Sequence, residues 1–426
     1  MEVRMHDRKV LRENPDIFRK GVSDRAAEID IDRLLQLDAE WRGLVAEIDE
    51  MKHLKNVASA EVAELKKGGR DASEKIQSMR QVTQRIREME EKRDSLDEKI
   101  TNIMVLIPNL PESSVPVGRD SSSNVVMREW GEKRPLSRKP LPHWEIGEVL
   151  GILDFKRASK ISGAHFASYR GAGARLERAL INFMLDLHVN KHGYEEMFPP
   201  FLVNRDSMFG TAQLRYEEDM YRCEVDDLFL DPTAETPLVN MYRNEILSLE
   251  ELPLRFVGYT ACFRREAGSY GKDTRGLLRV HQFNKVELVS ITEPDMSSEE
   301  FDRILGHAEK VLQLLKIPYR VSCLSTGELS FASAKTYDLE AWAPGVDRWL
   351  EVSSVSNCTD FQARRAQIKY RRERGSPSLF VHTLNGSGLA TPRTFASLVE
   401  NYQEKDGSVV IPDVLRPYMN GLDRIR

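Results

Sequence analysis

One stretch of the chain, FRREAGSYGKDTRGLLRVHQFNKVEL, which runs from Phe263 to Leu288, carries cations on two short segments joined by a loop-like middle. Six of its 26 residues are Lys or Arg. Residues two apart on a strand share a face, so Arg264 with Glu266, and Lys285 with Glu287, would each present a cation beside a carboxylate. We predict a strand–loop–strand hairpin whose polar groups face inward. The simpler interpretation is a surface hairpin with cross-strand ion pairs.

Two further polar clusters lie where a core would be apolar. The first, 351–354, follows the apolar pair Trp349 and Leu350, and the second, 385–393, opens an apolar helix. A glycine-rich turn before a helix is the simple interpretation of the second cluster. Arg393 near a helix N-terminus is unfavourable for the helix dipole unless an anion binds there. Together the clusters indicate arginines and a carboxylate that converge on a polyphosphate bound with a metal ion.

The common nucleotide-binding signatures do not fit. In Gly271-Lys272-Asp273-Thr274 the residue after the lysine is Asp instead of Ser or Thr, and Glu266 stands where a phosphate loop has its first glycine. The segment 171–173 lacks the third glycine and the preceding strand of a dinucleotide site. A different arrangement must hold the phosphates.

Short strand-like runs surround these clusters and must position them. We predict strands at 226–232, 255–263, 277–290, 337–343 and 349–355, an extended segment at 194–203, and a helix over 173–193. Ser297-Ser298-Glu299-Glu300 predicts a capping box before another helix. Many adjacent strands with few intervening helices indicate an α+β fold with a largely antiparallel sheet and flanking helices.

The N-terminal part has a different period. Apolar residues recur every three or four positions in two segments, with one arginine on the second seam: Leu34, Leu37, Trp41, Leu44, Ile48 and Met51, then Ile86, Met89, Arg93, Leu96, Ile100 and Ile103. Gly68 and Gly69 separate the segments, so we predict an antiparallel two-helix coiled-coil arm at about 31–107, roughly 50 Å long. The expected domains are 1–110, a linker at 111–124, and a catalytic domain at 125–426.

Charge is sorted along this arm. The distal half, 52–87, holds nine Lys or Arg against four Asp or Glu, whereas 31–51 and 88–107 together hold five against twelve. A solvated helical surface is the simple interpretation. The sorting favours an extended polyanion bound at the basic tip, through Lys52, Lys55, Arg80 and Arg85 among others.

Composition limits the remaining possibilities. The chain has 426 residues, a formal net charge of −5 and 41% hydrophobic residues, which is typical of a soluble globular protein. Its four cysteines show neither CxxC nor Cys/His metal spacing, so no zinc site is expected. No apolar run reaches membrane-spanning length. We expect a cytoplasmic protein without a membrane partner.

Several stretches in order resemble bacterial-type seryl-tRNA synthetases, which are class II aminoacyl-tRNA synthetases. The resemblance covers essentially the whole chain, including the arm. The matching stretches are Phe263-Arg264-Arg265-Glu266 with Arg279-Val280-His281-Gln282-Phe283, Thr233-Ala234-Glu235 with Pro237-Leu238, 351–357, 384–393, Glu400-Asn401-Tyr402-Gln403 and 412–419.

The resemblance implies an activity, its partners and its site. Serine and ATP would give seryl-adenylate and pyrophosphate, and the seryl group would pass to the 3′ end of tRNA(Ser), gripped by its long variable arm, and of tRNA(Sec) where present. A homodimer formed through the helix and strand of 173–203 and a Mg²⁺ ion bound with ATP are also implied. The implied serine site is Thr233, Ala234, Glu235, Arg264, Glu287, Asn385 and Ser387. The implied ATP site is Arg264, Arg265, Glu266, Val280, Phe283, Glu351, Val352, Ser353, Ser354 and Arg393.

The resemblance also implies individual roles. Arg264 would bridge the α-phosphate and the serine carboxylate, Glu266 would read the adenine amino group, and Phe283 would stack on the ring. Glu351 and Ser354 would hold Mg²⁺, and Arg393 the γ-phosphate. Arg264, Glu351 and Arg393 are therefore the expected catalytic residues.

One departure from the family pattern is visible. Gly210-Thr211-Ala212-Gln213-Leu214 is followed directly by Arg215-Tyr216, one residue shorter than the family's usual Pro-Lys-aromatic run. A specialised paralogue with an altered loop, such as an inhibitor-resistant enzyme, therefore stays open. So does a ligase that activates an amino acid for an acceptor other than tRNA.

Overall fold

Residues 6–135, 139–267 and 275–426 are described by the computed structural model, in which the chain divides into two units, Met1–Pro108 and Asn109–Arg426. Residues 268–274, which include Gly271 to Thr274, lie outside the described residues.

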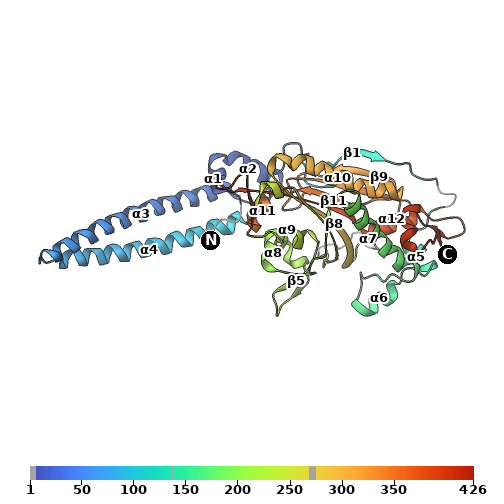
Figure 1. The fold of residues 1–426 in the computed structure, drawn as a ribbon, viewed down its shortest axis with the longest axis horizontal. Coiled ribbons are helices and arrows are strands. Elements are labelled where there is room, and N and C mark those ends of the chain that lie inside the picture. The colour runs from blue at the N-terminus through green and yellow to red at the C-terminus, as the bar shows by residue number, and fades with distance from the viewer. Residues whose placement is uncertain (1–5, 136–138, 268–274) are drawn as a thin grey trace. The chain divides into compact units, whose positions relative to one another are not determined.

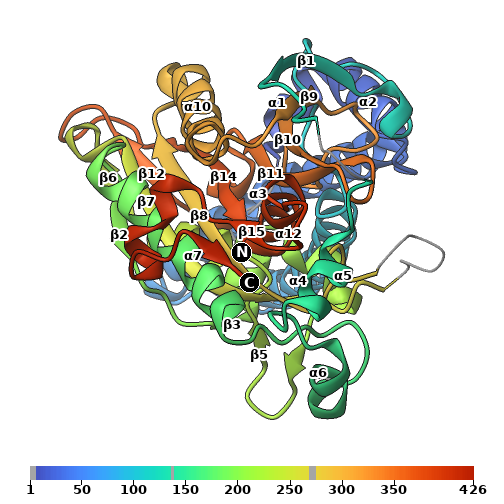
Figure 2. The same cartoon turned by 90° about the vertical axis from the view of Figure 1, so that its right-hand side faces the viewer.

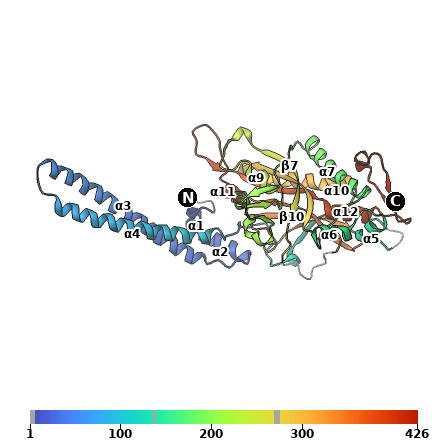
Figure 3. The same cartoon turned by 90° about the horizontal axis from the view of Figure 1, so that it is seen from below.

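The first unit is a helical hairpin with two short helices before it. Its helices are α1 (Arg8–Glu13), α2 (Pro15–Asp24), α3 (Ile31–Lys67) and α4 (Ser73–Met104). Figures 1 and 3 show α3 and α4 side by side along their length. Asp30 caps α3 by accepting from the Arg33 amide at 2.8 Å, and Gly69 makes the reversal possible with a φ of 68°. The predicted two-helix arm is confirmed.

The seam of the hairpin follows the predicted spacing over most of its length. Ile48 packs against Ile86 and Met89, and Leu96 and Ile100 are buried further along α4. At the end of α4 the fully buried residue is Met104 instead of the predicted Ile103. A straight helix drifts relative to a seven-residue repeat, which moves the buried position by one residue.

The second unit contains an eight-stranded sheet. Its strand order is β1 (Val125–Trp130), β9 (Tyr319–Cys323), β10 (Lys335–Ala343), β11 (Arg348–Asn357), β14 (His382–Ala390), β8 (Gln282–Thr292), β7 (Leu254–Phe263) and β2 (Glu195–Met197). Every neighbouring pair is antiparallel except β2 and β7. The α+β prediction is confirmed.

Smaller elements complete this unit. The helices are α5 (His143–Val149), α6 (Phe155–Ser162), α7 (Ala172–Asn190), α8 (Arg205–Gly210), α9 (Glu235–Asn240), α10 (Ser297–Leu315), α11 (Phe361–Ala366) and α12 (Thr391–Asn401). Short strands β3 (Leu202–Asn204), β4 (Arg222–Cys223) and β5 (Leu228–Leu230) form one small sheet, and β6 (Ile246–Ser248), β12 (Lys369–Arg371) and β13 (Leu379–Phe380) form another. None of the described helices has the length and apolarity needed to cross a membrane.

One face of the main sheet is covered by α7, α10 and α12, which share an apolar core with the sheet (Figure 2). Two glycines of β14 allow the close approach. A Cβ at Gly386 would lie 2.6 Å from Ile304, and one at Gly388 would lie 2.9 Å from His188. The glycine-rich segment is therefore the middle of a buried strand, and its interpretation as a turn is wrong.

The hairpin of β7 and β8 is largely buried and lies one strand from the β2 edge of the sheet, and it differs from the prediction at its open end. β7 stops at Phe263, so Arg264 and Glu266 do not share a strand face, and Glu266 has a left-handed φ of 54°. The chain leaves the sheet because the Arg265 amide donates to the Asp219 carbonyl at 2.7 Å. β8 starts at Gln282, later than the predicted 277.

The predicted capping box at Ser297 is absent. A 3-10 turn over Pro294–Met296 runs directly into α10, so Met296 is the N-cap residue and makes no side-chain capping bond. The Ser297 hydroxyl bonds instead to the Asn357 side chain at 3.3 Å.

The segment after the arm is bonded to the rest of the second unit. The amides of Asn109 and Glu112 donate to the carbonyls of Phe331 and Ala334, each at 2.9 Å, and the Thr326 amide donates to the Pro116 carbonyl at 2.9 Å. These backbone bonds fix a segment whose Pro/Ser-rich sequence indicates only a linker.

A buried carboxyl ties α7 to the sheet. Glu177 accepts from Asn284 of β8 at 2.8 Å and from the hydroxyl of Thr391, the first residue of α12. Its second oxygen has no hydrogen-bond partner among the described residues. Burial raises the pKa of Glu177 to about 7, although the bonds from Thr391 and Asn284 act to lower it.

Replacing Glu177→Gln should change how stability depends on pH. A raised folded-state pKa means that the stability due to the protonated carboxyl is full below the ordinary value and is lost as pH rises through about 7. Glutamine does not titrate, so the variant should gain about 2 kcal/mol over wild type between pH 5 and pH 8. Urea unfolding at several pH values measures this. The exposed Glu196→Gln should show no such trend, and a constant difference for Glu177→Gln would contradict the prediction.

Candidate active site

A cluster of buried polar side chains, the polar pocket, lies on the face of the central strands opposite α7 and α10. Lys285 and Glu287 lie on β8, and Ser387 lies on β14 directly beside Glu287. All three are buried. The Lys285 ammonium is 2.5 Å from a Glu287 oxygen, and the Ser387 hydroxyl donates to the same oxygen at 3.5 Å. The predicted shared face of Lys285 and Glu287 is confirmed.

A second wall of the pocket is the turn before α9. Lys285 donates to the Thr233 hydroxyl at 2.7 Å, and that hydroxyl accepts from the Glu235 amide at 3.3 Å. The Thr233 amide donates to Asp231 at 3.2 Å. Ala234 is fully buried and offers no side-chain polar group. Local sequence patterns do not single out Asp231, whose second oxygen has no partner among the described residues.

Glu235 reaches into the pocket from the first position of α9. One of its oxygens accepts from Gln362 at 2.5 Å and from Asn385 at 2.9 Å. Burial raises the pKa of Glu235 to about 7, the bond from Gln362 lowers it, and the Glu287 charge raises it again. Burial also raises the pKa of Asp231 to about 7. A pocket with three carboxyls and one lysine is electronegative, which suits an ammonium group.

The shortened loop lies beside this pocket. Ala212 packs in an apolar cluster with Cys358, and Asn385 donates to the Cys358 sulfur at 3.7 Å. The Tyr216 hydroxyl accepts from the Phe331 amide at 3.2 Å in the same region. The loop therefore contacts Cys358, which accepts from Asn385, and Asn385 in turn donates to Glu235.

A more open cationic region begins at Arg264. Its guanidinium donates to the Pro232 carbonyl at 3.2 Å and lies 5.3 Å from the centre of the Phe283 ring. Glu266 pairs with Arg279, and Arg265 donates to the Met220 carbonyl at 3.1 Å. Val280 is buried in the turn before β8. A planar cation beside an aromatic ring can hold an oxyanion next to a stacked heterocycle.

Arg393 provides a second guanidinium, next to the segment that precedes β8. It is the third residue of α12, as the helix N-terminus prediction requires. Its guanidinium donates to a Glu351 carboxylate oxygen at 3.2 Å and to the Leu278 carbonyl at 3.1 Å. Val352 is buried, and the Ser353 hydroxyl donates to the Ser387 carbonyl at 2.6 Å. The Val352 side chain is therefore packed in the interior, and the Ser353 hydroxyl is already hydrogen-bonded within the sheet.

Glu351 and Ser354 lie on β11 beside a partly buried aspartate that sequence reasoning missed. Asp338 of β10 is paired with Ser354, and its Oδ1 has no partner among the described residues. Burial and the Glu351 charge raise the pKa of Asp338. These donors are all oxygens, which fits Mg²⁺. Within the described ranges, no three or more His, Cys, Asp or Glu side chains gather in an arrangement that could hold a metal ion.

A buried His–Glu pair anchors the segment that follows residue 274. His143 donates through Nδ1 to Glu400 at 2.8 Å and accepts at Nε2 from the Leu277 amide at 2.9 Å. The other Glu400 oxygen accepts from the Gly345 amide at 2.7 Å. Only glycine fits at position 276, because a Cβ there would lie 2.4 Å from His143. The next residue, Leu278, accepts a hydrogen bond from Arg393 through its carbonyl. The His143–Glu400 pair therefore fixes the position of the carbonyl that Arg393 bonds.

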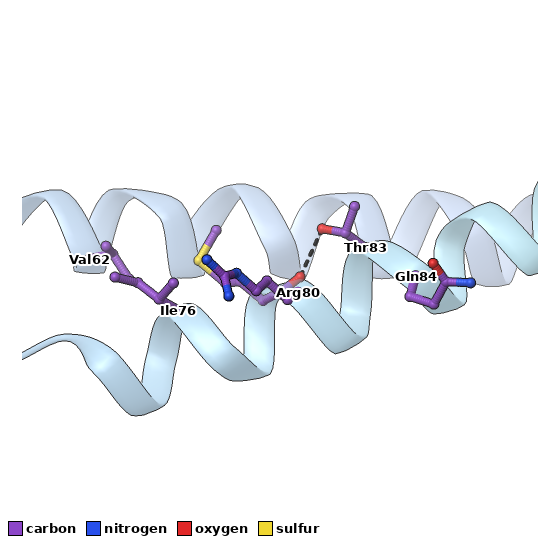
Figure 4. A pocket seen from close by; sticks show the side chains of 6 residues that line it. Val62, Ile76, Arg80, Thr83 and Gln84 are labelled. Carbon is purple, nitrogen blue, oxygen red and sulfur yellow. Dashed lines mark hydrogen bonds between the residues drawn. The ribbon is translucent and has the colours of Figure 1, made fainter.

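The distal part of the arm has a small pocket between its helices. Figure 4 shows Val62 of α3 lying against Ile76 of α4, with Arg80 and Thr83 along the same helix. Two of the basic residues expected to bind a polyanion form ion pairs within the arm. Lys52 pairs with Glu90 at 2.7 Å, and Arg85 pairs with Glu88 at 3.7 Å. These exposed pairs can exchange partners at little cost.

Two family models match the chain. The tRNA synthetase class II core domain (G, H, P, S and T) matches residues 220–402, and the seryl-tRNA synthetase N-terminal domain matches residues 5–111. A serine–tRNA ligase of Caldanaerobacter subterraneus is 53% identical over 99% of both chains. A crystal structure of seryl-tRNA synthetase from Pyrococcus horikoshii complexed with ATP has a TM-score of 0.94 at 40% identity over 99% of both chains. The cytoplasmic serine–tRNA ligase of Naegleria fowleri, in complex with AMP, has a TM-score of 0.90 at 31% identity, also over 99% of both.

Replacing His143→Ala should loosen the segment around Leu277. The change removes the Nδ1–H donor from a buried carboxyl and leaves the Leu277 amide without its acceptor, a loss of about 2–3 kcal/mol. Urea unfolding and hydrogen exchange at the Leu277 amide measure the two effects. Arg134→Ala, which breaks a partly exposed pair with Glu404, is the control and should cost less than about 1 kcal/mol. An unchanged Leu277 exchange rate in the His143 variant would rule out the anchoring role.

Proposed function

The chain belongs to the seryl-tRNA synthetase family of class II aminoacyl-tRNA synthetases, and we propose that it activates L-serine with ATP and transfers the seryl group to tRNA(Ser). The observation that carries the proposal is the convergence of Glu235, Glu287 and Ser387 in one buried pocket beside Arg264. Such a pocket offers acceptors for an ammonium and partners for a hydroxyl. The arginine at its edge suits a carboxylate or phosphate.

Serine would be selected by hydrogen bonding to its hydroxyl. We assign Glu287 and Ser387 to the hydroxyl and Thr233 and Glu235 to the ammonium, with Asn385 holding Glu235. A buried site built to bond a hydroxyl rejects alanine, because alanine leaves these polar groups unpaired. Threonine would be excluded by its size, because the walls of the pocket are closely packed.

Adenylate formation needs positioning more than covalent help. An oxygen of the ionised serine carboxylate attacks the α-phosphorus of ATP, the bond to the bridging oxygen breaks, and pyrophosphate leaves. Arg264 would hold the serine carboxylate and the α-phosphate together, and Arg393 would bind the γ-phosphate. Both supply fixed positive charge where negative charge develops. No general base is required, because the attacking group is already ionised.

The adenine would lie against Phe283, with its amino group at Glu266 and backbone contacts from Val280. Glu351 and Ser354 would hold Mg²⁺, which when bound would neutralise phosphate charge. Two protein oxygens suffice, because Mg²⁺ keeps several waters and phosphate oxygens as ligands. Arg265, whose exposed guanidinium is bonded among the described residues only through Nε to the Met220 carbonyl, would contact ATP through its side chain. Val352 and Ser353 would contribute through their backbone, since the first is buried and the hydroxyl of the second bonds the Ser387 carbonyl.

In the second step, a hydroxyl of the terminal adenosine of tRNA attacks the seryl carbonyl and AMP leaves. The coiled-coil arm would bind the long variable arm of tRNA(Ser) through its basic distal half. We further propose a homodimer that uses α7 and the extended segment after it, where Phe198 is 79% exposed. These partners rest on family membership and on the exposed residues.

Pyrophosphate exchange with each of the twenty amino acids tests the proposed activity, followed by charging of a tRNA(Ser) transcript. Serine alone should support exchange, and the transcript should be charged. Exchange with serine but no charging would favour a ligase for another acceptor. Exchange only with a different amino acid would contradict the assignment of the pocket.

Replacing Arg264→Ala should abolish adenylate formation without unfolding the protein. The side chain is partly exposed and bonds the Pro232 carbonyl, so little packing is lost. A preorganised group that binds developing charge contributes about 3–4 kcal/mol to the transition state, which is a loss of at least a hundredfold in exchange rate. Circular dichroism checks the fold. An exchange rate near the wild-type value in the folded variant would remove Arg264 from the mechanism.

Deleting the arm should separate the two reaction steps. With 37–104 replaced by a short linker, serine-dependent exchange should persist, because the proposed serine and ATP residues all lie in the second unit. Charging of tRNA should collapse. Charging at the intact rate would make the arm a spacer or a protein-binding element.

Neutralising Lys52, Lys55, Arg80 and Arg85 together in the full chain should flatten the salt dependence of tRNA binding. Each lost phosphate contact lowers the log–log slope by about 0.7–0.9. Neutralising Lys92 and Lys99, which lie in the proximal half of the arm, is the control and should leave the slope unchanged.

A further inference from the structure

A buried lysine occupies the centre of the amino-acid pocket, and the function proposed above gives it no role. Lys285 is 7% exposed and has two bonding partners in the pocket. Its ammonium is 2.5 Å from Glu287 and 2.7 Å from the Thr233 hydroxyl. Those two partners are the residues assigned to the hydroxyl and to the ammonium of serine. Lys285 therefore contacts one residue assigned to the serine hydroxyl and one assigned to the serine ammonium.

The charges that face Lys285 come from several elements. Glu287 lies on its own strand, and Asp231 and Glu235 lie on the turn and helix that form the second wall. On the neighbouring β7, Thr260 lies opposite Lys285 in the strand register, and the buried Cys262 is close enough for the lysine charge to act on its thiol. The Arg264 charge also acts on Glu235, and the proposed mechanism assigns that arginine to the carboxylate and phosphate.

The lysine charge reaches the two titrating carboxyls. It lowers the pKa of both Asp231 and Glu235, against a larger upward effect of burial. Three carboxyls cannot all stay ionised in a buried space without a cation, because each like charge disfavours the next. Lys285 thus limits how many protons the pocket holds before any ligand arrives.

We propose that Lys285 is a positioning residue for serine recognition, which holds Glu287 against the Thr233 wall as a hydrogen-bond acceptor and offsets the carboxyl charge that the serine ammonium and hydroxyl must meet. This inference rests on the proposed function of the pocket. It assigns no bond-making step to Lys285.

The wild-type protein should show a pH-dependent affinity for serine. Below about pH 7 Asp231 and Glu235 take up protons and lose their ability to accept from an ammonium, so the KM for serine should rise as pH falls. The KM for ATP should not follow this trend, because the phosphates bind in the open cationic region.

The test compares the serine KM of wild type, Lys285→Met and Lys285→Arg in pyrophosphate exchange from pH 6 to pH 8.5. Methionine fills a similar volume without charge, so Asp231 and Glu235 should stay protonated to a higher pH in this variant. We expect the inflection to move upward by about one unit and the serine KM at pH 7 to rise about fivefold, with a smaller difference from wild type at pH 8.5. Arginine should keep the inflection near the wild-type position, and the ATP KM should change less than about twofold in both variants.

Matched controls separate this role from simple packing. Lys335→Met removes a lysine that pairs with Glu112 at 3.1 Å outside the pocket, and it should leave the serine profile unchanged. If Lys285→Met does not fold, Lys285→Ala assayed with added ethylammonium replaces it, and saturable recovery of the serine KM at pH 7 supports the role.

Two results would overturn the inference. A serine KM for Lys285→Met that equals wild type, or that is raised by the same factor at every pH, would show a packing role only. Failure of ethylammonium to restore the alanine variant would likewise show that the lysine only fills space. These results leave wild-type serine exchange intact, whereas failure of the proposed function would show as no serine-dependent exchange in the wild type.

Discussion

The alternation of side chains along β8 and β14 is the constraint on which the rest of the second unit depends. Successive residues of a strand face opposite sides of the sheet. On one side, Gly386 and Gly388 let α10 and α7 approach closely, and Asn284 bonds to Glu177. On the other side, Lys285, Glu287 and Ser387 form the pocket. A slip of one residue in register would place the charges in the apolar core and the glycines in the pocket.

Burying so much charge requires that the charged groups find partners. Glu287 has Lys285, and Glu235 has the amides of Gln362 and Asn385. Asp231 and Glu177 each keep one oxygen without a partner among the described residues, and burial raises the pKa of both to about 7. The protein thus carries carboxyls that are poised near neutral pH on both faces of the same sheet.

The open cationic region depends on supports from distant parts of the chain. Arg393 is oriented by the Leu278 carbonyl, and the position of Leu278 is set by the bonds of His143 and Glu400 to the preceding backbone. Glu400 and Arg393 lie two turns apart on α12, so one helix carries both the Arg393 guanidinium and the anchor of its acceptor. Removing the anchor would therefore disturb the guanidinium without touching it.

The two-helix arm, the antiparallel α+β body and the shared face of Lys285 and Glu287 could all be predicted from the amino-acid sequence, because each follows from the periodicity of local segments and their order along the chain. Stretches that resemble a family also indicated most of the proposed site residues. The ends of β7 and β8, the N-terminus of α10 and the strand conformation of 385–390 depended on contacts with residues far along the chain, such as Asp219, Asn357 and Ile304. The same holds for Asp231, Asp338 and the His143–Glu400 pair, whose importance comes from burial and from partners on other elements. Local patterns report backbone periodicity, whereas desolvation and hydrogen-bond partners across the fold exist only once the tertiary structure has formed.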